Sequence, residues 1–162
     1  MEKTIIISTG GTFNKIYNKF TGNLDIDKSN SSINSIQKEW LSSYKFIDII
    51  NKDSLDFTTQ DREELLKTIK ELNYKKIVII HGTDTIDITA KFLDSAKLDK
   101  TIVLTGAMVP YSINPIEATA NLAFAIGYSN LAKNGIYIAI NGVAQHYSKV
   151  IKNRQIGKFE LI

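Results

Sequence analysis

The sequence predicts an α/β fold in which a parallel β-sheet is covered by helices on both faces. Short apolar runs rich in β-branched residues, such as Ile5 to Ile7 and Ile77 to Ile80, alternate with segments whose apolar residues recur at helical spacing. Within these runs apolar and polar residues do not alternate, which is typical of strands buried on both faces of a parallel sheet. The succession of patterns therefore favours parallel strands joined by helical crossovers.

Length and composition agree with one domain and exclude several classes of site. The 162 residues, of which 43% are hydrophobic, can form a single sizeable core, so we expect one domain over residues 1–162. The net charge is only +3 and the lysines are scattered among acidic residues, which argues against a nucleic-acid partner. Cysteine is absent, which excludes disulfides, thiolate catalysis and cysteine-bound metals.

Neither the N-terminal region nor the apolar runs indicate export or membrane insertion. The first expected strand begins by Thr4 with no charged leader before it, and no apolar run approaches the length that spans a membrane. We therefore expect a cytoplasmic protein without a membrane partner.

The first half of the chain is expected to hold two strands and two helices. After the opening strand, the polar stretch from Phe13 to Ser32, which contains glycine, asparagine and two aromatic residues, is predicted to be a long mobile loop. The elements expected next are a short amphipathic helix at Ile33 to Leu41, a strand at Phe46 to Ile50 and a helix at Thr58 to Leu72 that Thr58 caps.

The second half repeats the alternation. Strands are expected at Ile77 to Ile80, Ile102 to Leu104 and Ile136 to Ile140, with a helix after Thr85 and a long apolar helix from Pro115 to about Ala132. Proline is favoured at a first helical position, and Gly135 is placed to end the long helix. The tail from Asn141 is expected to be less regular.

Three of the expected strands end in small polar clusters. These clusters are Thr9 to Thr12, His81 to Thr85, and Thr105 to Ala107. Because the carboxyl ends of parallel strands meet at one edge of a sheet, the clusters are expected to converge on a single pocket there.

The residues alone leave the chemistry of this pocket open. Threonine or serine can act as a nucleophile when a base is near, and His81 or His146 can complete a Ser-His-Asp arrangement. His81, however, ends an apolar strand, where a histidine is more often a buried structural residue. Asp84 stands where a helix begins and suits a capping role, and a metal site made of His81 and Asp84 has too few ligands.

Three motifs resemble one enzyme family. Thr9 to Thr12 (TGGT) and His81 to Thr85 (HGTDT) are similar to the paired signatures of the bacterial-type L-asparaginases and glutaminase-asparaginases. Thr105 to Pro110 resembles a third signature, with Val109 where arginine is common. The resemblance covers about residues 4–160 and implies a three-layer fold of the flavodoxin or Rossmann type. That is the family's larger N-terminal domain, and we expect its smaller C-terminal domain to be absent.

The resemblance implies a set of catalytic residues. Thr12 corresponds to the nucleophile and Thr83 to the second catalytic threonine, with Asp84 and Lys152 completing the network of Thr83. A partly desolvated lysine near Asp84 can polarise or deprotonate the Thr83 hydroxyl. The lid tyrosine of the family falls nearest Tyr17, although Lys19 and Phe20 also lie close to that slot.

The same resemblance implies how an amino-acid amide is bound. Backbone N–H groups at the Gly11-Thr12 and Gly82-Thr83 turns can stabilise an oxyanion. The remaining contacts are a substrate carboxylate on Ser54, an α-ammonium group on Asp84 and a side-chain amide on the carbonyl of Ala107. Leu55 stands where a glutamine is common, and the absent C-terminal domain normally lends an acidic residue to the neighbouring subunit's site.

The sequence therefore predicts an amidohydrolase that releases ammonia from L-asparagine, glutamine or a related small-molecule amide, with no metal or organic cofactor. The alternative is a non-catalytic module that binds an amino acid or small anion in the same pocket as a sensor. A flavodoxin-like nucleotide binder ranks third, because the hydroxyl-rich loops lack residues for base stacking and ribose binding.

The long helix also predicts self-association. Apolar residues surround most of the helix from Pro115 to about Ala132, which is typical of a helix buried on more than one side. One side can be the sheet and the other a second copy of the chain, so we expect a homodimer. The alternative is that small alanines let this helix pack deep inside its own domain.

Overall fold

The computed structural model describes residues 3–40 and 42–162 of the chain. Within these residues, six strands form a sheet with the order β4-β1-β5-β6-β7-β8, in which only β8 is antiparallel to its neighbour. The strands are β1 (Thr4–Gly10), β4 (Lys45–Lys52), β5 (Lys76–Ile80), β6 (Thr101–Thr105), β7 (Gly135–Ile140) and β8 (Val143–His146). The predicted parallel sheet is confirmed.

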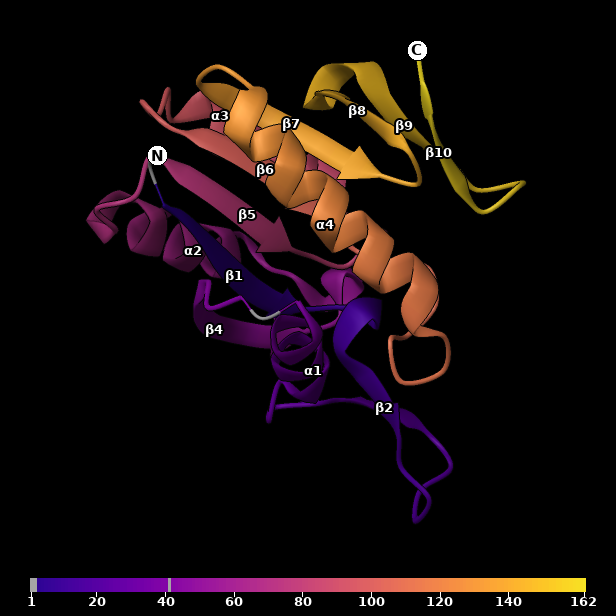
Figure 1. Cartoon of the computed structure of the whole chain (residues 1–162). Coiled ribbons are helices and arrows are strands. Elements are labelled where there is room, and N and C mark those ends of the chain that lie inside the picture. The colour runs from indigo at the N-terminus through magenta and orange to yellow at the C-terminus, as the bar shows by residue number, and fades with distance from the viewer. Residues whose placement is uncertain (1–2, 41) are drawn as a thin grey trace.

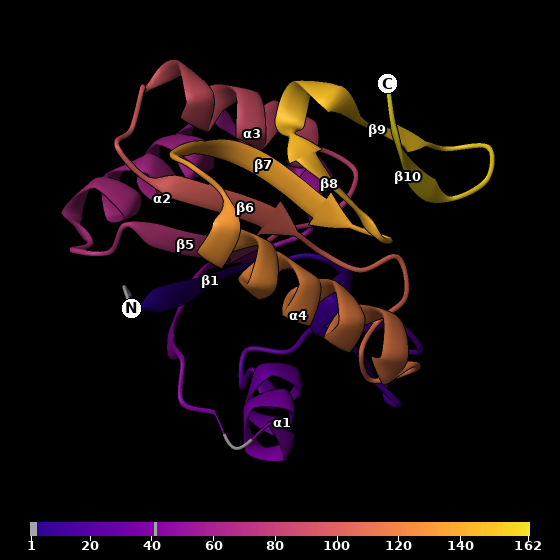
Figure 2. The ribbon, with the colours of Figure 1, turned by 45° about the horizontal axis from the view of Figure 1, so that its top comes forward.

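Helices cover both faces of this sheet, as Figures 1 and 2 show. They are α1 (Ser31–Glu39), α2 (Thr59–Glu71), α3 (Ile86–Ser95) and α4 (Pro115–Leu131). In Figure 2, α2 and α3 lie above the sheet while α1 and α4 lie below it. Ile5 and Ile7 pack in the core between the sheet and helices α2 and α3, and Ile6 packs in the core between the sheet and helices α1 and α4. Successive residues of β1 are thus all buried, which explains why its sequence shows no alternation.

The connection from β6 to β7 has an unusual hand. The chain moves in the same direction across the sheet from β5 to β6 and from β6 to β7, yet α3 and α4 lie on opposite faces. The two crossovers therefore have opposite hands. Those through α1 and α2 share the hand of α3, so the crossover through α4 is the left-handed one, against the strong right-handed preference. As a result, α4 covers the same face of the sheet as α1 (Figure 2).

The helix termini agree with the sequence signals in most places. Thr58 and Asp61 form a reciprocal capping box at the start of α2, and Asn114 caps α4 just before Pro115. However, α4 ends at Leu131 followed by an extended Ala132, and Gly135 opens β7. The prediction that Gly135 ends this helix is therefore wrong. α1 starts at Ser31 and ends at Glu39; Leu41, which was expected to extend it, lies outside the described residues.

The prediction of a long loop at residues 13–32 is wrong in its structure. A short 3-10 helix at Thr12–Asn14 is followed by an antiparallel hairpin of β2 (Lys15–Tyr17) and β3 (Leu24–Ile26). The turn between these strands closes through local bonds, since Asn18 donates its N–H to the Asn23 carbonyl and accepts that of Gly22. Gly22 has φ +74°, a conformation that favours glycine.

The tail from Asn141 is also more regular than expected. β8 lies at the edge of the main sheet, and a short 3-10 helix at Tyr147–Lys149 leads to the hairpin of β9 (Val150–Asn153) and β10 (Lys158–Leu161). Val150 and Phe159 anchor this hairpin, because both are buried in the core that contains α3. None of the described helices has both the length and the apolar character needed to cross a membrane.

Candidate active site

The loops after β1 and β5 meet at the carboxyl edge of the sheet, where strand order reverses between these two strands. The contact is so close that only glycine fits: a Cβ on Gly11 would lie 2.6 Å from the Cα of Gly82. A Cβ on Gly82 would in turn lie 2.5 Å from the Oγ of Ser54, which opens a short 3-10 helix at Ser54–Asp56. The loops carrying Thr12, Thr83 and Ser54 are therefore packed against one another at the place where such sheets bind ligands.

Thr12 is positioned by the backbone around it. Gly11 has φ +78° and donates its N–H to the carbonyl of Lys52 at 3.0 Å. β4 bends to make this bond, since Ile50 and Asn51 adopt left-handed φ values of 73° and 55° next to a register shift. The Gly11 N–H is thus already engaged. Among the described residues, the N–H groups of Gly82 and Thr83 donate to no acceptor, so these two can point at a developing oxyanion.

Thr83, Asp84 and Lys152 form a hydrogen-bonded cluster. The Lys152 Nζ donates to the Thr83 Oγ1 at 2.8 Å and to the Asp84 Oδ1 at 2.9 Å. The Lys152 hydrogen bond is the main cause that lowers the pKa of Asp84 below its ordinary value, and Arg154 adds to it. The lysine side chain is 13% exposed and that of Asp84 is 31% exposed, so the pair is partly shielded from water.

The β9–β10 hairpin carries Lys152 into this cluster. Lys152 pairs in register with Phe159, whose buried side chain fixes the hairpin against the core. Adjacent residues of a strand point to opposite faces, so burying Val150 beneath the hairpin places Lys152 on the same side. Thr83 is 69 residues away from Lys152 in the sequence.

A cavity of about 230 Å³ opens beside the cluster. Its lining residues are Thr83, Asp84, Ile86, Asp87, Val150, Ile151, Lys152, Arg154 and Phe159. Thr12 and Ser54 do not line it, although the sequence predicted a common cavity for both with Thr83 and Asp84.

Ser54 is closed off in this structure. It is 1% exposed, and its Oγ is buried without a hydrogen-bond partner among the described residues. Such a hydroxyl is a suitable acceptor or donor for a ligand that displaces the surrounding loop. The next residue, Leu55, is 69% exposed and offers an apolar surface.

The loop after β6 is held by α4. Glu117 accepts the N–H groups of Met108 and Val109 at 2.9 and 3.0 Å, and Asn121 donates to the Gly106 carbonyl. These bonds fix Ala107, which is 1% exposed. Neither polar residue was predicted from the sequence, although their spacing of four on a mostly apolar helix was the available signal.

Tyr17 lies apart from the cluster. It ends β2 in the hairpin that projects from the body of the molecule in Figure 1, and it is 65% exposed. In the described part of the chain its hydroxyl makes no hydrogen bond. Its role as a lid residue stays a prediction.

His81 is a buried structural histidine. It is fully buried, its Nδ1 lies 2.8 Å from the Gly82 carbonyl and its Nε2 lies 2.9 Å from the Thr89 hydroxyl. Burial lowers the pKa of His81 to about 4, so the ring is neutral at pH 7. His146 ends the edge strand β8, and its Nδ1 lies 2.9 Å from the hydroxyl of Ser148. Among residues 3–40 and 42–162, neither ring hydrogen-bonds to Thr12 or Thr83, and no group of three metal-ligating side chains occurs.

Arg62, on α2, connects two loops of the site through hydrogen bonds. It is 8% exposed and donates to the carbonyls of Phe57 and Thr58, which follow Ser54, and to the hydroxyls of Thr85 and Thr89. Sequence reasoning missed this residue as well. Its place three residues before the buried Leu65, on the inner face of α2, was the available signal.

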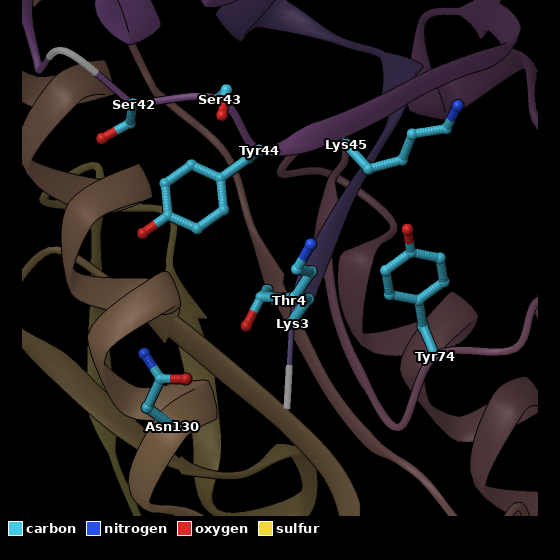
Figure 3. Close-up of a pocket in the computed structure, with 8 residues that line it drawn as sticks. All are labelled: Lys3, Thr4, Ser42, Ser43, Tyr44, Lys45, Tyr74 and Asn130. Atoms are coloured by element: carbon cyan, nitrogen blue, oxygen red, sulfur yellow. The ribbon is translucent and has the colours of Figure 1, made fainter. Parts of the chain in front are cut away.

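A larger cavity of about 670 Å³ lies at the opposite, amino-terminal edge of the sheet (Figure 3). Its lining residues are Lys3, Thr4, Ser42, Ser43, Tyr44, Lys45, Tyr74 and Asn130. None of them belongs to the predicted site. The smaller cavity is the better candidate because convergent charged and hydroxyl groups, rather than size, permit catalysis.

The fold and the site together define an α/β protein with a threonine, lysine and aspartate cluster at the switch point of its sheet. The family model described as "Asparaginase, N-terminal" matches residues 3–158. The chain therefore belongs to this family.

Individual relatives agree with this assignment. The chain is 27% identical over 160 residues to the L-asparaginase of Thermococcus kodakarensis, covering 96% of this chain and 49% of the relative. It is 29% identical over 153 residues to the glutaminase-asparaginase of Acinetobacter glutaminasificans, covering 86% and 46% respectively. The chain thus spans about half the length of the curated relatives it matches.

Solved structures show the same likeness. The structure of the probable cytoplasmic L-asparaginase from Campylobacter jejuni matches with a TM-score of 0.81 and 30% identity, covering 99% of this chain and 52% of that one. The thermostable L-asparaginase from Thermococcus kodakarensis also gives a TM-score of 0.81, at 26% identity over 99% of this chain and 51% of that chain.

Proposed function

We propose that this chain is an amidohydrolase that releases ammonia from the side-chain amide of L-asparagine or a related small amide. The observation that carries the proposal is the contact of Lys152 with both Thr83 and Asp84 beside the Gly11–Gly82 junction. Membership of a family whose relatives are named L-asparaginase and glutaminase-asparaginase supports it.

In the proposed reaction, the Thr12 hydroxyl oxygen attacks the amide carbon and forms an ester as the C–N bond breaks. The amide nitrogen takes up one proton, which in the net balance is the one that the Thr12 hydroxyl loses, and leaves as ammonia. Thr83 accepts a hydrogen bond from Lys152, so its own hydroxyl proton is free to be given to the leaving nitrogen. Water then hydrolyses the ester, restoring Thr12 and yielding the carboxylate. The N–H groups of Gly82 and Thr83 stabilise the oxyanion of both steps.

The proposal is tested by measuring ammonia release from L-asparagine, L-glutamine and other small primary amides. Thr12→Ala is expected to abolish release, because Ser8 and Thr9, the hydroxyl residues that precede the glycine junction on β1, are fully buried and already hydrogen-bonded. Thr68→Ala, at a half-exposed threonine in the middle of α2, is the matched control and should keep full activity. Ligand binding without any ammonia release by the unmodified chain would favour the sensor alternative.

We further propose that the chain forms a homodimer through the outer face of α4. The apolar residues on this face remain exposed in the single chain: Ile116 is 75% exposed, Phe124 37% and Leu131 87%. Sedimentation at micromolar concentration is expected to give a dimer that Phe124→Glu dissociates. Ile88→Glu, at a half-exposed apolar residue of α3 on the opposite face of the sheet, is the control that should leave it intact. A monomer of the unmodified chain would contradict the proposal.

We also propose a cytoplasmic location, supported by the Campylobacter jejuni structure, whose name includes that term. A relative from Haemophilus influenzae is named as periplasmic, and cell fractionation distinguishes the two.

A further inference from the structure

Arg62 is a buried cation whose hydrogen bonds go to neutral groups. Within residues 3–40 and 42–162 it forms no ion pair with a carboxylate. Its Nε donates to the Thr89 Oγ1 at 3.1 Å. A guanidinium group can only donate, so this bond occupies a lone pair of the Thr89 hydroxyl and makes the hydroxyl hydrogen a better donor to the next group.

The next group is the ring of His81. The Thr89 Oγ1 lies 2.9 Å from the His81 Nε2, and the His81 Nδ1 lies 2.8 Å from the carbonyl of Gly82. A carbonyl oxygen cannot donate, so Nδ1 carries the proton of the neutral ring and Nε2 accepts the Thr89 hydroxyl. The hydrogen bonds therefore all run in one direction, from Arg62 through Thr89 and His81 to the carbonyl of Gly82.

That carbonyl belongs to the peptide that supplies a proposed oxyanion donor. The described chain contains no cis peptide bond, and in a trans peptide the C=O and the following N–H point in opposite directions. Because the Gly82 carbonyl is held by the ring of His81, the N–H of Thr83 is directed away from this ring. Phe57 packs against the ring with its centroid 4.7 Å from that of His81, which limits movement of the imidazole.

Gly82 cannot fix the direction of this peptide by itself. Glycine is required there because a Cβ would lie 2.5 Å from the Oγ of Ser54. Glycine also gives the adjoining peptide more freedom to rotate than any other residue does. A backbone N–H stabilises an oxyanion best when its direction is set before the reaction, so the hydrogen bond from His81 supplies what the glycine lacks.

We propose that Arg62, Thr89 and His81 are positioning residues for the proposed reaction. Together they orient the peptide between Gly82 and Thr83 so that its N–H points at the developing oxyanion. The inference rests on the proposed function, which supplies the oxyanion. It goes beyond that function in assigning a role to three residues that do not line the cavity beside the cluster.

Steady-state kinetics of ammonia release from L-asparagine separate this role from a merely structural one. Thr89→Val removes the hydroxyl and keeps the shape of the side chain. It is expected to lower kcat about tenfold and to change KM less than about twofold, because the oxyanion develops only in the transition state. Thr101→Val, at a similarly buried threonine on β6 whose hydroxyl bonds the carbonyl of Ala132, is the matched control and should leave both constants unchanged.

A double variant tests whether Thr89 acts through His81. His81→Leu removes the donor to Gly82 and is expected to lower kcat about 30-fold. In this background Thr89→Val should lower kcat no further, because the group through which the hydroxyl acts is absent. His81→Asn, whose amide nitrogen can take the place of Nδ1, should keep kcat within about threefold of the unmodified chain.

Two NMR measurements need no activity. The ¹⁵N shifts of the imidazoles, assigned with the help of His146→Gln, should show the proton on the Nδ1 of His81 at pH 7. The residual dipolar coupling of the Thr83 N–H bond reports the direction of that bond. It should change in Thr89→Val and stay the same in Thr101→Val.

The inference is overturned if the proton of His81 lies on Nε2, or if the coupling of Thr83 is the same with and without the Thr89 hydroxyl. It is also overturned if Thr89→Val leaves kcat unchanged, raises KM as much as it lowers kcat, or keeps its full effect in the His81→Leu background. Absence of ammonia release from every amide, with both NMR results as expected, supports the positioning of the Thr83 N–H and contradicts the proposed function alone.

Discussion

The two threonine loops of the site are held in place by different means. Thr83 is 5% exposed and its hydroxyl is fixed by Lys152 at 2.8 Å. Thr12 is half-buried, and within the described residues its hydroxyl has no hydrogen-bond partner. Backbone contacts of Gly11 set its place: Gly11 donates its N–H to Lys52, accepts that of Asn14 and adjoins Gly82.

The difference indicates a division of labour within one pocket. On the Thr83 side, charged groups fix the direction of a hydroxyl before any ligand arrives, as acid–base catalysis requires. On the Thr12 side, the main chain fixes the position of the residue and leaves the hydroxyl free to turn toward a carbonyl carbon.

The largest expected effect is on turnover and comes from the lysines. Lys152→Met should lower kcat for ammonia release about 1,000-fold, because Thr83 loses the group that orients its proton. Lys15→Met, on the Thr12 side, removes the ion pair with Asp53 and should lower kcat less than about tenfold. Steady-state kinetics of the two variants measure both values. Similar losses in the two would show that the Thr12 side also depends on charge.

The next effect concerns the glycine junction. Gly11→Ala should destabilise the chain by more than about 2 kcal/mol and reduce activity, because its Cβ meets the backbone of Gly82 and its φ is +78°. Gly22→Ala has a similar φ of +74° but no atom within 4 Å of the added Cβ, so only the backbone strain of about 1 kcal/mol remains. Urea unfolding measures both. Equal destabilisation would mean that the contact with Gly82 contributes nothing.

Acid should destabilise the two sides in different pH ranges. Burial lowers the pKa of His81 from 6.5 to about 4. As the pH falls, the unfolded chain therefore takes up the proton of this imidazole before the folded chain does. The contribution of neutral His81 to the free energy of unfolding is fully present above pH 6.5. It falls by about 1.4 kcal/mol per pH unit as the pH drops toward 4. His81→Gln should remove this slope, whatever its stability at pH 7.

On the Thr12 side the responsible group is Asp27, which follows β3. Burial alone raises its pKa, but hydrogen bonds from Ser29 and Ser31 outweigh that effect and lower the pKa to about 2. Its stabilisation is therefore complete above its ordinary pKa of 3.8 and is lost only as the pH falls toward 2. Urea unfolding of Asp27→Asn across both ranges should lack the lower transition and keep the upper one. A single common range for both variants would contradict the assignment.

The smallest effect is expected in the β2–β3 hairpin. Two strands of three residues each are marginally stable, and most residues between Ile16 and Asp25 are exposed. Amide hydrogen exchange of residues 14–30 should therefore be fast without ligand and slower with it, if this segment closes over the site. The amides of β5, next to Thr83, serve as the control and should not change. Equal exchange of residues 14–30 with and without ligand would exclude a lid.

The sequence alone determined the elements whose signals are local. The continuous apolar runs of β1, β5 and β6 required strands covered on both faces, and Thr58 with Asp61 marked the start of α2. It also placed hydroxyl and carboxylate groups at the ends of β1 and β5, since residues that follow strands in a parallel sheet meet at one edge. The regular structure of the tail and of residues 13–32 was missed because their strands are short and their pairing depends on neighbours.

Only the tertiary structure decided how these parts form one site. The left-handed crossover through α4 leaves no mark in the periodicity of the helix, which depends on spacing along the chain and not on which face the helix covers. Arg154 reaches Asp84 across 70 residues of sequence, and Gly11 touches Gly82 where the loops after two neighbouring strands meet. The family resemblance pointed to Lys152. The local pattern of a strand, however, does not indicate which distant carboxylate the side chains of that strand will contact. Contacts of this kind are fixed by packing of the whole chain.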